Sequence, residues 1–187
     1  MRKLLLSTAT ALAVSLLAGC FPLALTGVAA TALMAGDRRT TGTYIEDEGI
    51  EWKALGQLRE RFPGAHVNAT SFNRKVLLTG EAPTEEMKRE VAEAVRKIAN
   101  VADVANEVQV AAPSNLSTRG SDSLVTTNVK ARLVNNGKVS PNHVKVVTEA
   151  GTVYLMGIVS QAEGDAAADI ARSTSGVKGV VKVFEYR

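Results

Sequence analysis

An internal repeat is the feature that most constrains the fold of this chain. The pattern His-Val, followed nine residues later by Val-x-Leu-x-Gly, starts at His66 and again at His143, 77 residues further on, with no gap in between. Apolar positions before the pattern also repeat, at an offset of 75: Ile50, Ala54 and Leu58 match Val125, Val129 and Leu133. Solenoid repeats are about 20–50 residues long. This longer period therefore predicts two tandem domains.

The second copy shows the elements most clearly. Its first apolar positions lie four apart and predict one face of a helix: Val125, Val129 and Leu133. Candidate N-cap residues for that helix are Ser121, Asp122 and Ser123. The β-rich runs 144–148 and 153–157 predict a hairpin. Ser160 and Glu163 fit a capping box that opens a second helix, and 180–186 predicts a last strand.

The first copy follows the same order. Its hairpin is expected at 67–72 and 76–80, its second helix from Thr84, and its last strand at 104–110. We therefore predict an α+β protein with two tandem α-β-β-α-β domains, at 44–111 and 121–187, joined by a linker at 112–120. Each domain is expected to place two helices on a three-stranded mixed sheet.

The N-terminus has the pattern of a secreted lipoprotein. Two basic residues precede an apolar run at 4–17, and Leu17-Ala18-Gly19-Cys20 contains the only cysteine of the chain. This tetrapeptide resembles the lipobox of bacterial lipoproteins, which implies a signal peptide at 1–19 and acylation of Cys20. The alternatives are a small buried cysteine and a membrane anchor at 4–17. That run is shorter than the ~20 residues that a spanning helix needs.

Removal of the signal leaves a nearly neutral chain. The formal charge of +3 includes Arg2 and Lys3, so the mature protein carries +1, and the composition does not indicate a nucleic-acid partner. Residues 20–43 are rich in Ala, Gly and Thr without a clear period, which is typical of a tether. Phe21 stands where an aspartate would resemble an inner-membrane retention signal, and its presence points to the outer membrane.

The second copy resembles the BON domain family (bacterial OsmY and nodulation). The matching pattern is Gly151-x-Val153-x-Leu155-x-Gly157-x-Val159, then a helix and Gly176-Val177-x-x-Val180. The first copy has Arg74 and Asn100 at two family glycine positions, where Asn73 and Asn100 can supply left-handed turns. The tether with two copies is similar to dual-BON-domain outer-membrane lipoproteins.

The resemblance implies a non-enzymatic protein that supports outer-membrane integrity. It also implies lipid anchoring at Cys20 on the periplasmic face, and binding of anionic phospholipid by the first helix of the second domain. On this sequence the implied lipid site comprises Leu124, Val125, Asn128, Lys130 and Arg132. An exposed leucine can enter the headgroup boundary, and basic side chains can meet lipid phosphates.

The first copy lacks that combination. The corresponding helix face there carries Gly49, Lys53, Gly56 and Glu60, with no apolar anchor, so we expect no lipid binding by it.

Two other functions are compatible with these residues. One is a scaffold in the cell envelope, in which Leu124 and Val125 bind another envelope protein and lipid is contacted only through the acyl anchor at Cys20. A purely structural role is also open, in which Leu124 packs against the other domain and Lys130 and Arg132 lie on an ordinary solvated face. Peptidoglycan or nonspecific periplasmic binding is a third reading, and it rests on fold analogy alone. The sequence does not determine an oligomeric state.

Catalytic chemistry is not indicated. His66 and His143 precede the first strand of each copy at equivalent positions, which suggests a role in the fold. No cluster of Cys, His or carboxylate residues accompanies them in the sequence, so we expect no metal site. No Gly-rich phosphate loop or Ser-His-Asp order stands out. We therefore expect no catalytic residues and no cofactor.

Overall fold

The structure is a computed structural model that describes residues 36–187, and these residues form one compact unit. The predicted signal peptide, at 1–19, and the predicted lipidation site, Cys20, lie outside the described residues.

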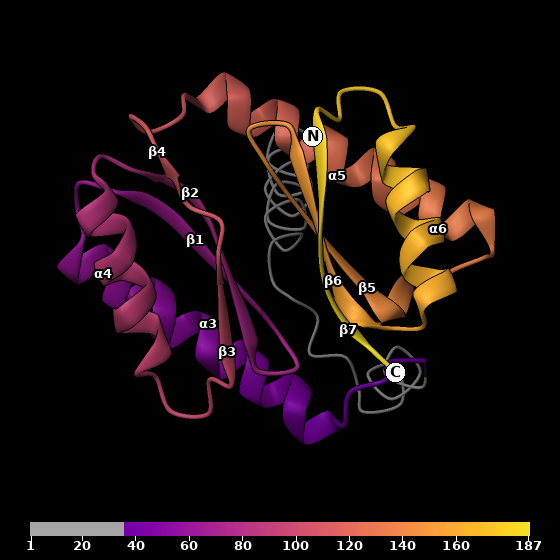
Figure 1. The fold of residues 1–187 in the computed structure, drawn as a ribbon, viewed down its shortest axis with the longest axis horizontal. Helices are drawn as coiled ribbons and strands as arrows, with labels where there is room; N and C mark the ends of the chain where they lie inside the picture. Colours follow the sequence, from indigo (N-terminus) through magenta and orange to yellow (C-terminus); the bar gives the residue numbers. More distant parts are fainter. Residues whose placement is uncertain (1–35) are drawn as a thin grey trace, which may run out of the picture. The chain divides into compact units, whose positions relative to one another are not determined.

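The first domain has the predicted order of elements (Figure 1). Its bounds are α3 (Thr41–Arg61), β1 (His66–Phe72), β2 (Lys75–Ala82), α4 (Glu85–Arg96), β3 (Asp103–Asn106) and β4 (Gln109–Val110). Strand β1 pairs antiparallel with β2, and β2 pairs in parallel with both β3 and β4. The last strand predicted at 104–110 is thus divided into two short strands.

The second domain repeats this arrangement. It comprises α5 (Leu116–Asn136), a 3₁₀ turn (Pro141–His143), β5 (Val144–Glu149), β6 (Thr152–Val159), α6 (Gln161–Arg172) and β7 (Gly179–Tyr186). The sheet order is β5-β6-β7, with an antiparallel hairpin and a parallel last strand. The α+β class and the two α-β-β-α-β units on mixed sheets are confirmed.

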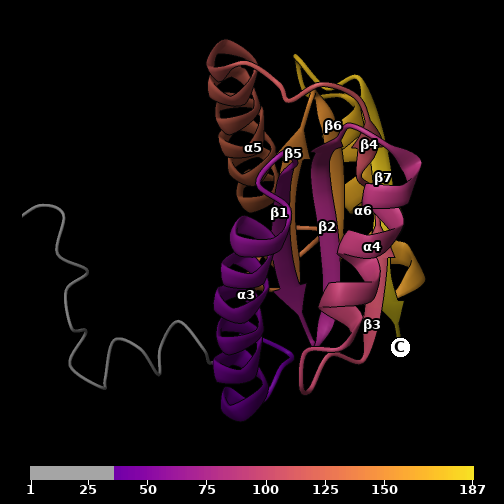
Figure 2. The ribbon, with the colours of Figure 1, turned by 90° about the vertical axis from the view of Figure 1, so that its left-hand side faces the viewer.

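Each domain buries a core between its helices and one face of its sheet. In Figure 2, α3 lies along β1 and α5 lies along β5. The apolar residues four apart on these helices are buried as predicted, in two separate clusters. The capping box is also present, because the Ser160 and Glu163 side chains each accept a hydrogen bond from the other's backbone N–H.

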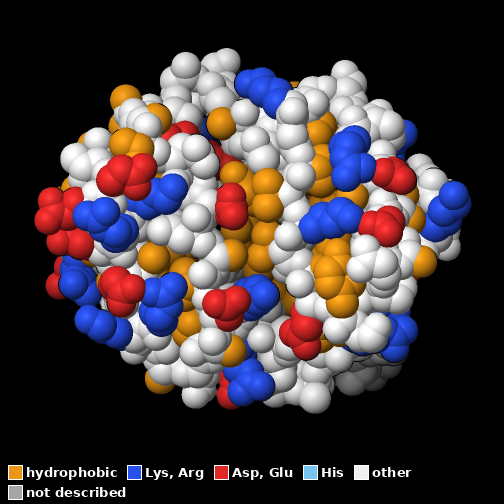
Figure 3. Space-filling model, viewed as in Figure 1, with side chains coloured by type: hydrophobic (Ala, Val, Ile, Leu, Met, Phe, Trp, Pro, Cys, Tyr) orange, Lys and Arg blue, Asp and Glu red, His pale blue; other side chains and the backbone are white. Residues whose placement is uncertain are grey.

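The opposite faces of the two sheets pack on each other. Central strands β2 and β6 are apolar on both sides, so alternate residues point to different cores. Leu78 and Leu155 face the helices of their own domains, whereas one cluster joins residues of both sheets: Phe72, Leu77, Tyr154 and Met156. Figure 3 shows the apolar side chains gathered in the middle of the molecule, where β3 and β7 lie in Figure 1.

Two turns that contain glycine in the second domain contain other residues in the first domain, and these residues also have a left-handed backbone conformation. Asn73 has φ 53°, Arg74 has φ 64° and Asn100 has φ 70°. The corresponding turns of the second domain contain Gly151 at φ 83° and Gly176 at φ 88°. The prediction that Asn73 and Asn100 supply left-handed turns is confirmed.

Helices α3 and α5 both begin earlier than the sequence pattern indicates. The N-cap of α5 is Asn115, which accepts a hydrogen bond from the Thr118 N–H, and not one of the predicted residues Ser121, Asp122 or Ser123. The helix thus starts within the segment expected to be a linker. Likewise, α3 starts at Thr41, within the segment expected to be a tether, and Thr40 caps it.

Candidate functional site

The outward face of α5 is the surface on which the predicted lipid site falls. Leu124 is 68% exposed, and Val134 is another large apolar side chain exposed on this helix. Both lie away from the core positions that the four-residue spacing turns toward β5. Leu124 therefore does not pack against the other domain within residues 36–187.

The charge of α5 favours an anionic partner. Lys130 and Arg132 are exposed, and the only acidic residue of the helix, Asp122, is buried. The Arg132 guanidinium donates from Nη1 to Thr174 Oγ1 and from Nη2 to Ser173 Oγ, both at 3.0 Å. These bonds fix its position at the end of α6, so the exposed surface of α5 combines apolar and basic side chains.

The predicted site residues do not all lie on one surface. Asn128 is exposed together with Leu124, Lys130 and Arg132. Val125 is only 7% exposed and packs in the core of the second domain. Its methyl groups hold α5 on the sheet and do not face solvent.

The outward face of α3 also carries large apolar side chains, contrary to our expectation. Trp52 is 75% exposed and Ile45 is 64% exposed. They are seven residues apart, so they lie on the same side of the helix, opposite the buried Ile50 and Ala54. The prediction considered only the positions transferred from α5, which carry no large apolar side chain, and it therefore missed Trp52 and Ile45 on the adjacent side of the helix. Taking the side opposite the predicted core would have found Trp52.

The two outward faces differ in charge. Exposed acidic side chains accompany Trp52 on α3, at Glu48 and Glu60, together with basic Lys53 and Arg59. No exposed acidic side chain accompanies Leu124 on α5. An anionic surface would therefore meet less repulsion at α5 than at α3.

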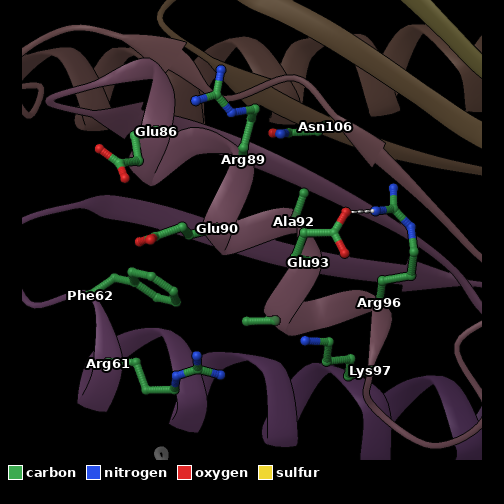
Figure 4. Close-up of a pocket in the computed structure, with 11 residues that line it drawn as sticks. Arg61, Phe62, Glu86, Arg89, Glu90, Ala92, Glu93, Arg96, Lys97 and Asn106 are labelled. Carbon is green, nitrogen blue, oxygen red and sulfur yellow. Dashed lines mark hydrogen bonds and ion pairs between the residues drawn. The ribbon is translucent and has the colours of Figure 1, made fainter.

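A hollow of about 810 Å³ lies between the end of α3 and α4 in the first domain (Figure 4). Its lining carries basic Arg61, Arg89, Arg96 and Lys97 and acidic Glu86, Glu90 and Glu93. Arg96 and Glu93 pair with each other at 2.6 Å. The lining thus carries side chains of both charges, and it contains no candidate nucleophile placed beside a candidate base.

The two histidines occupy different surroundings. His143 Nδ1 lies 3.4 Å from Glu163 Oε1. Hydrogen bonds from Arg38 hold the pKa of the Glu163 carboxyl well below its usual range. His66 lies beside two buried carboxylates, Glu81 and Glu149. The premise that no carboxylate cluster accompanies the histidines is therefore wrong for His66, because the fold brings Glu149 across from the other domain.

No helix in residues 36–187 has both the length and the apolar character needed to cross a bilayer.

Comparison with known proteins identifies the family. The BON domain matches residues 46–112 and again 121–187. The chain belongs to the BON domain family. It is 39% identical to the outer membrane lipoprotein DolP of Haemophilus influenzae, over 91% of this chain and 90% of the relative. It is also 35% identical to a 21 kDa hemolysin of Actinobacillus pleuropneumoniae, over 80% and 79% of the two chains. The osmotically inducible protein Y of Escherichia coli is 28% identical, over 74% and 72%.

Proposed function

We propose that this BON-domain protein is a lipoprotein of the outer membrane's periplasmic face, anchored at Cys20. The similarity to an outer membrane lipoprotein spans most of both chains, and the sequence of this chain carries the predicted lipobox Leu17-Ala18-Gly19-Cys20. The protein acts by binding and not by turnover, and in this position it supports the integrity of the outer membrane.

Helix α5 recognises anionic phospholipid. The observation that carries this proposal is that α5 exposes Leu124, Lys130 and Arg132 while its only acidic side chain is buried. Leu124 enters the headgroup boundary, and the basic side chains meet phosphates at about 1 kcal/mol each. Tethering by the acyl chains raises the effective concentration of lipid, so a weak patch is sufficient.

Vesicle binding tests this function without the acyl anchor. Residues 20–187 carrying Cys20→Ser would be mixed with vesicles of phosphatidylglycerol or of phosphatidylcholine, and the bound fraction measured by flotation. We expect binding to phosphatidylglycerol alone, and a loss of at least fivefold in affinity for Leu124→Asp.

The matched control is Val110→Asp, which places the same charge at another exposed apolar side chain, on β4. It should bind as the parent does. Equal binding to both lipids, or equal losses in the two variants, would refute recognition by α5.

A scaffold function is the second candidate because Trp52 is exposed on α3 among side chains of both charges. Tryptophan is enriched at protein interfaces, and a face of mixed charge suits a protein partner better than an anionic bilayer. Trp52 is the only tryptophan of the chain, so its fluorescence reports on α3 alone. Its emission maximum should stay unchanged with phosphatidylglycerol vesicles. A shift to shorter wavelength would instead place α3 in the lipid.

A further inference from the structure

A histidine and two glutamates converge where the two domains meet. His66 begins β1 and pairs across the strands with Glu81 of β2, with Nδ1 3.0 Å from Glu81 Oε2. Glu149 ends β5 of the second domain. One ligand atom from each of these three residues lies within 4.8 Å of the others.

Both carboxylates are withdrawn from solvent. Glu81 is 6% exposed and Glu149 is 8% exposed. Asn68 Nδ2 donates to Glu149 Oε2 at 3.1 Å, and the Ser114 N–H donates to Glu81 Oε2 at 3.1 Å. Within residues 36–187, the second oxygen of each carboxylate receives no hydrogen bond. One oxygen of each buried carboxylate, Oε1 of Glu81 and Oε1 of Glu149, is thus available to a ligand.

This arrangement is electrostatically unfavourable without a cation. Glu81 and Glu149 are both buried and lie close together, so their charges repel each other. Buried Asp122 lines the same hollow and adds a third carboxylate. Arg119 lies nearby, but its guanidinium donates to Ser114, and no ion pair with these carboxylates forms. The cluster therefore carries an excess of negative charge.

We propose that His66, Glu81 and Glu149 bind a zinc ion that joins the two domains, with water completing its coordination. An imidazole with two carboxylates suits zinc, whereas calcium takes six to eight oxygen ligands. Ligand atoms around tetrahedral zinc lie about 3.4 Å apart, so the widest pair must close by at most about 1.4 Å. A glutamate side chain can make that movement by a change of rotamer.

An entry path and supporting hydrogen bonds are also present. A hollow of about 470 Å³ is lined by His66, Asn68 and Glu149 and has room for water ligands. Asn68 and the Ser114 backbone orient the two carboxylates from outside the ligand set, as supporting residues commonly do at metal sites.

Zinc titration tests this proposal. The purified chain 20–187 with Cys20→Ser would be treated with a chelator and titrated with zinc chloride by calorimetry. We expect one zinc ion per chain and a rise in the thermal midpoint. Magnesium and calcium at the same concentration should not raise the midpoint. His66→Gln and Glu149→Gln should each weaken zinc binding at least tenfold.

The matched control is His143→Gln, at the equivalent position of the second domain. Its neighbouring carboxylate, Glu163, is already paired with Arg38. Glu149→Gln keeps the side-chain shape and an acceptor for Asn68, so it should fold, and its amide NMR spectrum would verify this. Absence of zinc binding, or equal loss in His143→Gln, would overturn the proposal.

Discussion

Arg38 links the segment before α3 to the second domain. Its guanidinium donates to both Glu163 carboxylate oxygens, at 2.7 and 2.9 Å, and to the Ile158 carbonyl at 2.7 Å. The next residue, Arg39, pairs with Asp37 and with Asp47 of the first domain. Arg38 therefore binds the second domain and Arg39 binds the first. The segment that we expected to be the end of a tether connects the two domains.

This arrangement predicts how stability depends on pH. Hydrogen bonds from Arg38 lower the pKa of Glu163, so the stability they provide is complete above the ordinary value of 4.5 and is lost as the pH falls below it. Arg38→Gln should lower the free energy of unfolding at pH 7 by about 1 kcal/mol, and by less as the pH falls toward 3. Urea unfolding at several pH values measures this difference.

The control for that prediction is Arg172→Gln, which removes an exposed ion pair with Asp169 on α6. A surface pair contributes little to stability, so this change should be nearly neutral. A loss from Arg38→Gln that is the same at pH 3 and pH 7 would contradict the role of Glu163.

At the scale of the elements, a buried aspartate on the first helix of each domain holds the adjacent hairpin. Asp122 on α5 accepts from the Ala150 and Gly151 N–H groups, each at 2.8 Å. Asp47 on α3 accepts in the same way from the Asn73 and Arg74 N–H groups. The two aspartates are 75 residues apart, at the offset of the helix core positions. Helix and hairpin are thus joined by charge-assisted hydrogen bonds as well as by the core.

Removing Asp122 should destabilise the second domain. Asp122→Ala leaves two backbone N–H groups without their acceptor, at a cost of about 1–3 kcal/mol in the free energy of unfolding. Urea unfolding followed by circular dichroism would measure the loss. Asn135→Ala, at an exposed position of the same helix, is the control and should change little. A neutral Asp122→Ala would show that the turn forms without this cap.

Local patterns predicted the elements well and their partners poorly. The spacing of Val125, Val129 and Leu133 and the capping box at Ser160 depend only on neighbours in the sequence, and the structure confirms both. Asp122 looked like an N-cap because a polar residue before an apolar run fits that role. Its true partners lie 28 and 29 residues away, a distance that no helix pattern reports.

The lipid site and the histidine cluster show the same limit. Periodicity placed Leu124 on an outward face but could not bring Glu149 beside His66, since they are joined only through packing of the two domains.

At the scale of the whole molecule, the packed sheet faces should make the two domains unfold together. Met156 is 1% exposed and lies in the cluster that joins Leu77 of one sheet to Tyr154 of the other. Lys145 of β5 reinforces the contact by pairing with Glu51 of α3 at 2.6 Å. Because a separated domain would expose this apolar face, we expect one calorimetric transition whose van't Hoff and calorimetric enthalpies agree.

Met156→Asp should uncouple the domains without unfolding them. A carboxylate between the sheets has no partner and costs several kcal/mol, whereas the core of each domain lies on the other side of its sheet. Differential scanning calorimetry should then resolve two transitions at lower temperatures. Val110→Asp, which adds the same charge at an exposed position, should keep one transition. Two transitions already in the unaltered protein would mean that the sheet contact is too weak to couple them, and a zinc ion at His66 would then have to supply the coupling.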